Sequence, residues 1–230
     1  MLMPSKASRG HLFESGFMTN EMNGRIEALM ARYVAGTLPE PARILVDTHL
    51  ALKDTNRDLV QGLEAMAGDD LEKTEIAAVT KRDERLERIF VSSAPKIAPR
   101  TESTGIFPAP LKDFVGFDAD QVPWRTKLPG FREFDIGEFD GCHASLFWIR
   151  PGRKIPAHDH EGMELTLVLH GAFSDVFGRY GRGEIAVADE TVDHRPIAEN
   201  ETPCIGFAVT EGSLRLSGPV HQRLGDILGL

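Results

Sequence analysis

The sequence predicts two domains, an N-terminal all-α helical bundle followed by a C-terminal all-β barrel. Apolar residues recur at helical spacing from about residue 22 to 90. Prolines among serines and threonines follow, which is typical of a linker. Beyond it, short apolar runs alternate with glycine, proline and aspartate, as in small β-barrels and sandwiches. The expected divisions are a disordered extension over 1–20, a helical domain over 21–90, a linker over 91–110 and a β domain over 111–230.

Four helical segments are expected in the N-terminal half. The first carries an apolar stripe and ends at Gly36, and the second opens at Pro39. The third is expected to end at the Gly68-Asp69-Asp70 segment, and a strongly charged fourth covers about 73–90. In the C-terminal half, the apolar runs 144–149, 165–169 and 205–209 are expected to be strands.

Composition excludes several classes of protein. The chain has 26 Lys and Arg against 35 Asp and Glu, for a formal charge of −9. A general nucleic-acid binder needs a basic surface, so no direct nucleic-acid contact is expected. No segment reaches the roughly 20 apolar residues of a membrane span, so no membrane partner is expected. The two cysteines, Cys142 and Cys204, are too few for a disulfide framework and fit a cytoplasmic protein with buried, inert thiols.

A candidate metal site lies in the β domain. His158 and His160 are two residues apart, so on a strand both side chains point to one face. Glu164 can return to that face after a bend at Gly162, and His194 can supply a fourth ligand from a neighbouring strand. Imidazole nitrogens with a carboxylate suit a borderline divalent metal. Zinc is the first choice, with iron, manganese and nickel as the alternatives that the ligand set leaves open.

The same segment resembles the first cupin motif at every position. Gly152, five residues, His158-x-His160, three residues, Glu164, six residues and Gly171 match it in order. The second cupin motif is matched less well, because Ala198 stands where an asparagine is expected. The resemblance implies a cupin barrel with His158, His160, Glu164 and His194 as metal ligands.

Nearly the whole chain is similar to the ChrR family of cupin-fused anti-sigma factors. The segments that carry the similarity are Tyr33–Leu38, Thr48–Leu52 and Glu164–Phe173. The resemblance implies that the helical domain binds an ECF-type RNA polymerase sigma factor. It also implies that the cupin domain releases sigma in response to oxidants.

One departure from the family concerns its structural zinc in the helical domain. His49 matches one zinc ligand, but Lys53 and Asn56 stand at the two cysteine positions, and the N-terminal histidine falls at Asn23 or Gly24. One ligand of four cannot hold zinc. No zinc is expected in the helical domain, and His49 is expected to be a core or boundary histidine.

Two other functions compete with the anti-sigma interpretation. A cupin with Met163, Leu165, Phe173 and Phe177 near its metal could be a metal-dependent dioxygenase of a small organic acid or diketone. Such an enzyme needs an acid, a base or an anion clamp beside the metal. The third hypothesis is a metal-dependent small-molecule sensor with a partner other than sigma.

Overall fold

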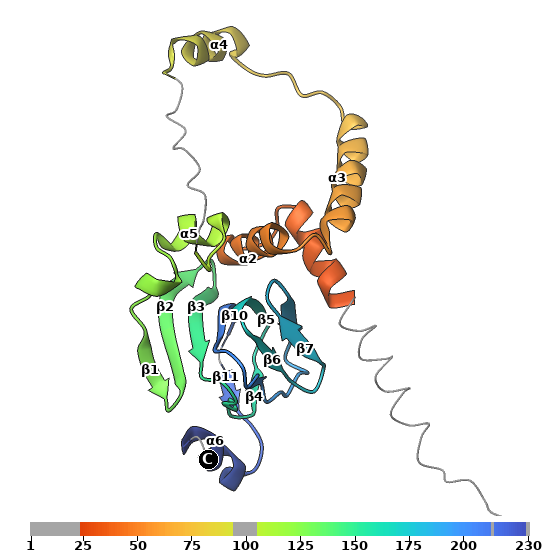
Figure 1. Ribbon diagram of the computed structural model, residues 1–230. Coiled ribbons are helices and arrows are strands. Elements are labelled where there is room, and N and C mark those ends of the chain that lie inside the picture. The colour runs from red at the N-terminus through yellow and green to blue at the C-terminus, as the bar shows by residue number, and fades with distance from the viewer. Residues whose placement is uncertain (1–23, 94–104, 213, 229–230) are drawn as a thin grey trace, which may run out of the picture.

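The structure is a computed structural model that describes residues 24–93, 105–212 and 214–228 (Figure 1). The expected disordered extension over 1–20 lies outside these residues, as does the middle of the expected linker. The domain boundaries at 20, 90 and 110 therefore stay predictions. No helix in the described ranges is long and apolar enough to cross a membrane.

The C-terminal part is a cupin-like β-sandwich (Figure 1). A six-stranded sheet in the order β1-β2-β3-β10-β5-β8 lies beside a three-stranded sheet, β7-β6-β9, and a strand pair, β11-β4. The three expected strands are confirmed as β3, β5 and β10. The strands are β1 Arg125–Leu128, β2 Phe131–Phe139, β3 Cys142–Ile149, β4 His158–His160, β5 Glu164–His170, β6 Ala172–Ser174, β7 Arg179–Gly181, β8 Ile185–Ala188, β9 Ile197–Ala198, β10 Cys204–Glu211 and β11 Leu214–Leu216.

The two faces of the six-stranded sheet have different roles, because side chains alternate along each strand. On β10, Phe207 and Val209 belong to the main apolar core, which includes side chains of the N-terminal helices. Ala208 and Thr210 alternate with them and line a cavity on the opposite face. The sheet is thus the wall between the helices and the candidate metal site.

Helices precede, follow and cover the sandwich. One helix covers residues 24–34, and Gly36 follows it with a positive φ of 66°, as expected for a helix stop. The remaining helices are α2 Glu40–Leu52, α3 Arg57–Glu72, α4 Arg82–Val91, α5 Ala109–Val115 and α6 Val220–Leu228, with a short 3-10 helix at Ala119–Gln121. The buried face of α2 includes Ala42, Leu45 and Val46, and these share one core with the sheet residues Leu167 and Phe207. Helix α2 therefore packs on the sandwich.

The expected all-α bundle is wrong. Val60 is the only buried residue of α3, and α4 buries none. Both helices stand away from the sandwich (Figure 1). The apolar residues of α2 and of the preceding helix share one core with the sheet, so no separate helical core forms. Two helix limits also differ from the prediction, because α3 continues through Gly68 to Glu72 and α4 begins only at Arg82.

A polar junction joins the end of α2 to the turn before β8. His49 is 3% exposed, and its Nδ1 lies 2.7 Å from the carbonyl oxygen of Gly183. Asn56 Nδ2 lies 3.0 Å from His49 Nε2, and Lys53 Nζ lies 2.6 Å from Glu184 Oε1. A side chain at Gly183 would collide with Lys53, because its Cβ would lie 2.9 Å from Lys53 Cγ. His49 is thus a buried histidine with both ring nitrogens hydrogen-bonded, as expected of a core or boundary residue.

Candidate metal centre

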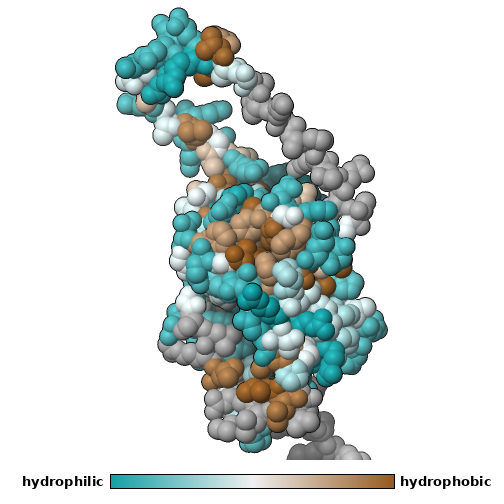
Figure 2. Space-filling view, turned by 90° about the vertical axis from the view of Figure 1, so that its left-hand side faces the viewer, coloured by the Kyte–Doolittle hydropathy of each residue, from teal (hydrophilic) through white to brown (hydrophobic). Residues whose placement is uncertain are grey.

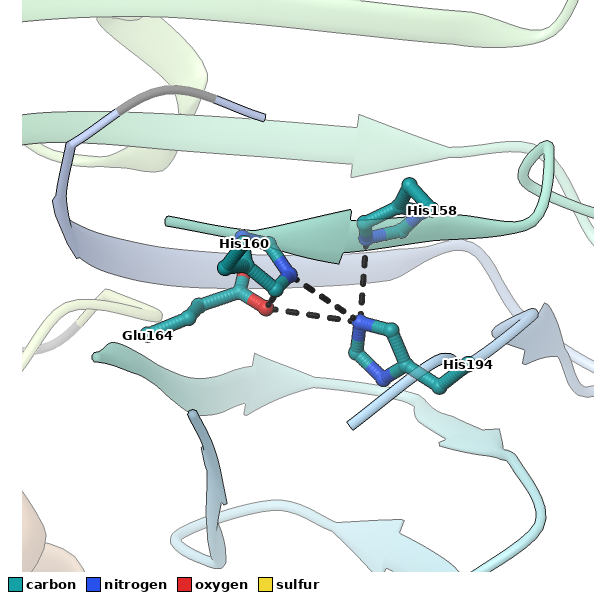
Figure 3. Close-up of side chains that lie close together, drawn as sticks. All are labelled: His158, His160, Glu164 and His194. Atoms are coloured by element: carbon teal, nitrogen blue, oxygen red, sulfur yellow. Dashed lines mark hydrogen bonds and ion pairs between the residues drawn. The ribbon is translucent and has the colours of Figure 1, made fainter. Parts of the chain in front are cut away.

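Local strand geometry brings four potential ligands together (Figure 3). His158 and His160 both lie buried on β4, with Asp159 pointing the other way between them. Glu164 opens β5 after the bend at Gly162. His194 faces His158 across an isolated β-bridge, whose two N–H···O bonds are both 3.1 Å long. Four side chains that the sequence singled out therefore converge in one place.

The ligand atoms are spaced as they would be around one metal ion. They all lie within 4.8 Å of one another. His194 Nε2 is 3.0 Å from His158 Nε2 and 3.4 Å from His160 Nε2, and Glu164 Oε2 is 2.9 Å from His160 Nε2. Bonds of about 2.1 Å place ligand atoms roughly 3.0–3.4 Å apart around an octahedral or tetrahedral ion. The residues present therefore fit a divalent metal.

Two contacts outside the cluster orient the imidazoles. Nδ1 of His158 lies 2.7 Å from the carbonyl oxygen of Pro156, so it is the nitrogen that carries the proton. Nδ1 of His194 lies 3.2 Å from Oδ2 of Asp175, whose side chain is 2% exposed. In the neutral form of each ring this leaves the Nε2 lone pair facing the centre of the cluster. Such outer hydrogen bonds commonly fix the tautomer of a metal-binding histidine.

The protonation of the cluster favours cation binding at Glu164 and at His158. Burial alone raises the pKa of Glu164, but hydrogen bonds to His160 and His194 outweigh it and hold the pKa below its usual range. Burial and the nearby His194 lower the pKa of His158 to about 4. For His194, burial lowers the pKa, while Asp175 and Glu164 raise it to a net value of about 9. Without a metal, His194 holds a proton between the two carboxylates, and a bound metal would take the place of that proton.

The backbone conformation and close neighbours explain why glycine occupies two positions of the first cupin motif. Gly171 has a φ of 69°, and a Cβ there would lie 2.3 Å from the carbonyl oxygen of Pro203. Gly152 also has a φ of 69°, and a Cβ would lie 2.6 Å from Oδ1 of Asn200. Only glycine fits these left-handed, crowded turns without strain. They bound the segment that carries the two candidate ligands of β4.

The cluster opens into a cavity of about 330 Å³. Phe173 and Phe177, expected near the metal, do line it. Met163 and Leu165 instead pack into the core on the other face of the sheet. The two cysteines are buried, unpaired thiols as expected, and burial raises the pKa of Cys204 to about 12.

Sequence reasoning missed Asp175 and His143. Asp175 lies in the loop after β6, nineteen positions before His194, and no spacing rule connects a loop carboxylate to a distant histidine. His143 lies on β3 and lines the cavity, with Nε2 3.1 Å from Oδ1 of Asp135. Strand alternation from Ser145, which faces the same cavity, would have placed it.

Fold and site together define a cupin domain with a candidate three-histidine, one-glutamate metal centre. Residues 112–214 match the family model described as the ChrR cupin-like domain. The chain is 38% identical over 194 residues to the anti-sigma-E factor ChrR of Cereibacter sphaeroides, covering 83% of this chain and 90% of that protein. The chain therefore belongs to the ChrR family of cupin-fused anti-sigma factors.

A solved structure supports this assignment along most of the chain. The crystal structure of Rhodobacter sphaeroides SigE in complex with the anti-sigma ChrR matches with a TM-score of 0.68 at 37% identity. The match covers 80% of this chain and 96% of that one. The similarity thus extends beyond the cupin domain into the helical region.

Proposed function

We propose that this protein is an anti-sigma factor. It sequesters an ECF-type sigma factor through its helices and responds to an oxidative or small-molecule signal through its metal-binding cupin domain. Two similarities support this proposal. The relative from Cereibacter sphaeroides is named an anti-sigma factor, and the similar solved structure is a complex of the anti-sigma ChrR with SigE. Binding to a subunit of RNA polymerase would place the protein in the cytoplasm.

The observation that carries the proposal is the exposure of α3 and α4, which we call the helical arm. Ile76, in the segment between the two helices, is 98% exposed, and Phe90 on α4 is 81% exposed. Figure 2 shows such hydrophobic residues on the outlying helical part at the top of the molecule. The exposed large hydrophobic residues of the arm and its ends are Met66, Leu71, Ile76, Val79, Ile89, Phe90 and Val91. Several large hydrophobic side chains exposed on one part of a chain suggest a protein interface.

The length of α4 supports the same conclusion. It has 10 residues and packs no buried side chain against the rest of the described chain. Isolated helices below about 12–15 residues are marginal in water. An amphipathic helix of this length becomes stable when a partner covers its apolar face, which is the helix-in-groove mode of recognition.

For the cupin domain we infer one divalent metal held by His158, His160, Glu164 and His194. Zinc is the first candidate, because imidazole nitrogens with one carboxylate can close a tetrahedral site. Iron, manganese and nickel accept the same donors. Bound, the ion would supply a fixed positive charge at the end of the cavity.

The dioxygenase alternative is not favoured. Among the described residues, no lysine or arginine lines the cavity. Arg150, Arg153 and Lys154, the nearest cations in sequence, are absent from its lining. An enzyme acting on a small organic acid needs such a clamp to orient the carboxylate.

The test is co-expression of the tagged full chain with an ECF sigma factor from the same genome. The proposal predicts a 1:1 complex on size exclusion that prevents sigma from binding core RNA polymerase. The matched pair Phe90→Glu and Leu228→Glu probes the helical arm against the C-terminal helix, since Leu228 is also exposed. Loss of the complex only in Phe90→Glu supports the proposal. A folded chain that captures none of the genome's ECF sigma factors overturns it.

A further inference from the structure

The cavity beside the metal centre has a floor that changes from polar to apolar. Three rows of side chains cross β3, β10 and β5 in register. The rows are His143–Thr210–Glu164, Ser145–Ala208–Thr166 and Phe147–Gly206–Val168. The floor therefore runs from the ligand Glu164, through a row with two hydroxyls, to a wholly apolar row.

The apolar end of the cavity is built from aromatic rings. Phe147 lies directly over Gly206, since a Cβ on that glycine would be 2.2 Å from the ring. Phe173 and Tyr180 stack with ring centroids 5.0 Å apart. Burial raises the pKa of Tyr180 well above its usual range, so the hydroxyl is neutral. These side chains form a second apolar cluster separate from the main core.

The polar groups of the middle row are available to a ligand. Ser145 and Thr166 are buried in the fold, yet both line the cavity. Neither hydroxyl forms a hydrogen bond with another protein group in the described part of the chain. Each residue borders the open cavity, where water or a ligand oxygen can pair with its hydroxyl.

The charges of the lining exclude an anion. Its acidic residues are Glu133, Glu138, Glu164 and Asp175, and no lysine or arginine of the described chain joins them. Lys127 neutralises Glu133 at 2.9 Å, while Glu164 and Asp175 are engaged with the histidine cluster. The negative charges of Glu164 and Asp175 would balance a bound divalent ion, so a buried carboxylate or phosphate would find no surplus positive charge. A buried cation would lose its hydration, while Glu133, Glu164 and Asp175 are already paired with other groups.

We propose that this cavity binds a neutral amphipathic molecule, with an apolar body against the Phe147–Gly206 row and one hydroxyl or carbonyl oxygen at the Ser145–Thr166 row. The volume of about 330 Å³ lies at the lower end of the range for small-molecule sites, which begins near 300 Å³. The assignment concerns the cavity alone and holds whether or not the helical arm binds a sigma factor.

Three probes of one shape test the charge preference. The full chain, with the metal it carries on purification, is titrated at pH 7 with 4-phenylbutan-1-ol, 4-phenylbutanoate and 4-phenylbutylamine by calorimetry and ligand-observed NMR. The alcohol is expected to bind saturably and at least tenfold more tightly than the carboxylate, with the amine weaker than the alcohol. Equal or tighter binding of the carboxylate or the amine overturns the proposal. So does the absence of binding by the phenyl alcohol, 1-hexanol and cyclohexanol alike.

Cavity-filling variants test the location. Ala208→Leu and Ala186→Leu both extend a side chain from the floor into the cavity. Thr126→Leu, at an exposed position of β1, is the matched control. At least one filled variant with an unchanged circular dichroism spectrum is expected to lose tenfold or more in alcohol affinity, while the control keeps it. Unchanged affinity in every folded, filled variant places the alcohol elsewhere and overturns the proposal.

Discussion

Replacing Phe90 with alanine is expected to weaken sigma binding without destabilising the free protein. Phe90 is 81% exposed on α4, so the free chain gains little from its ring. Exposed substitutions usually change the free energy of unfolding by less than about 0.5 kcal/mol. Fully burying a phenylalanine side chain contributes roughly 1.5–3 kcal/mol. If sigma covers the exposed part, the loss is about 1–2.5 kcal/mol, or roughly a 5- to 60-fold increase in Kd.

Calorimetric titration of full-length variants with the sigma factor measures this change, and thermal melts measure the stability. Leu228→Ala is the matched control, because Leu228 is 60% exposed on α6 at the other end of the molecule. An unchanged Kd for Phe90→Ala would refute the assignment of α4 to the interface. A Tm lowered by many degrees would show that Phe90 packs within the chain and that the reasoning from exposure fails.

Three further changes probe the metal centre and the fold. His160→Ala should lower bound metal well below one per chain, whereas His143→Ala, outside the ligand cluster, should not; full occupancy in His160→Ala would remove it from the site. Burial lowers the pKa of His49, so the unfolded state binds more protons below about pH 6.5, and stability should fall as pH drops below that value. Urea unfolding at pH 7 and 5.5 measures the free energy of unfolding. This free energy should fall less between the two pH values for His49→Gln than for wild type, and an equal fall would contradict the prediction. Asp118→Ala removes the carboxylate oxygen that accepts from the backbone N–H groups of Ile106, Phe107 and Ala119. The free energy of unfolding should therefore fall by at least about 2 kcal/mol. A Tm lowered by less than 1 °C would count against this role of Asp118.

The convergence of the four candidate ligands was predictable because its geometry is local. Strand alternation alone puts His158 and His160 on one face, and a short bend returns Glu164 to it. Predicting His194 as the fourth candidate ligand required only that its segment lie beside the one that carries His158. Asp175 could not be predicted, because its position depends on how the loop after β6 folds over the site.

The helical bundle was predicted wrongly for a physical reason. The apolar stripe of α2, with Leu45 and Val46, shows that one face is buried but not what covers it. A sheet covers such a stripe as well as another helix does, and here the sheet residues Leu167 and Phe207 do so. The stripe of α3 was assigned to the same core, although only residues near its start reach it and only Val60 is fully buried. Sequence periodicity cannot separate an internal core from a surface kept for a partner.

Hydrogen exchange of the full chain, alone and in complex with the sigma factor, tests the central claim most directly. Fast exchange of α3 and α4 is expected in the free protein, because few of their side chains are buried. In the complex, both helices should become strongly protected, with little change in β3, β5 and β10. Protection confined to the sandwich, with α3 and α4 exchanging equally fast in both states, would contradict the claim that the helical arm is the sigma-binding surface.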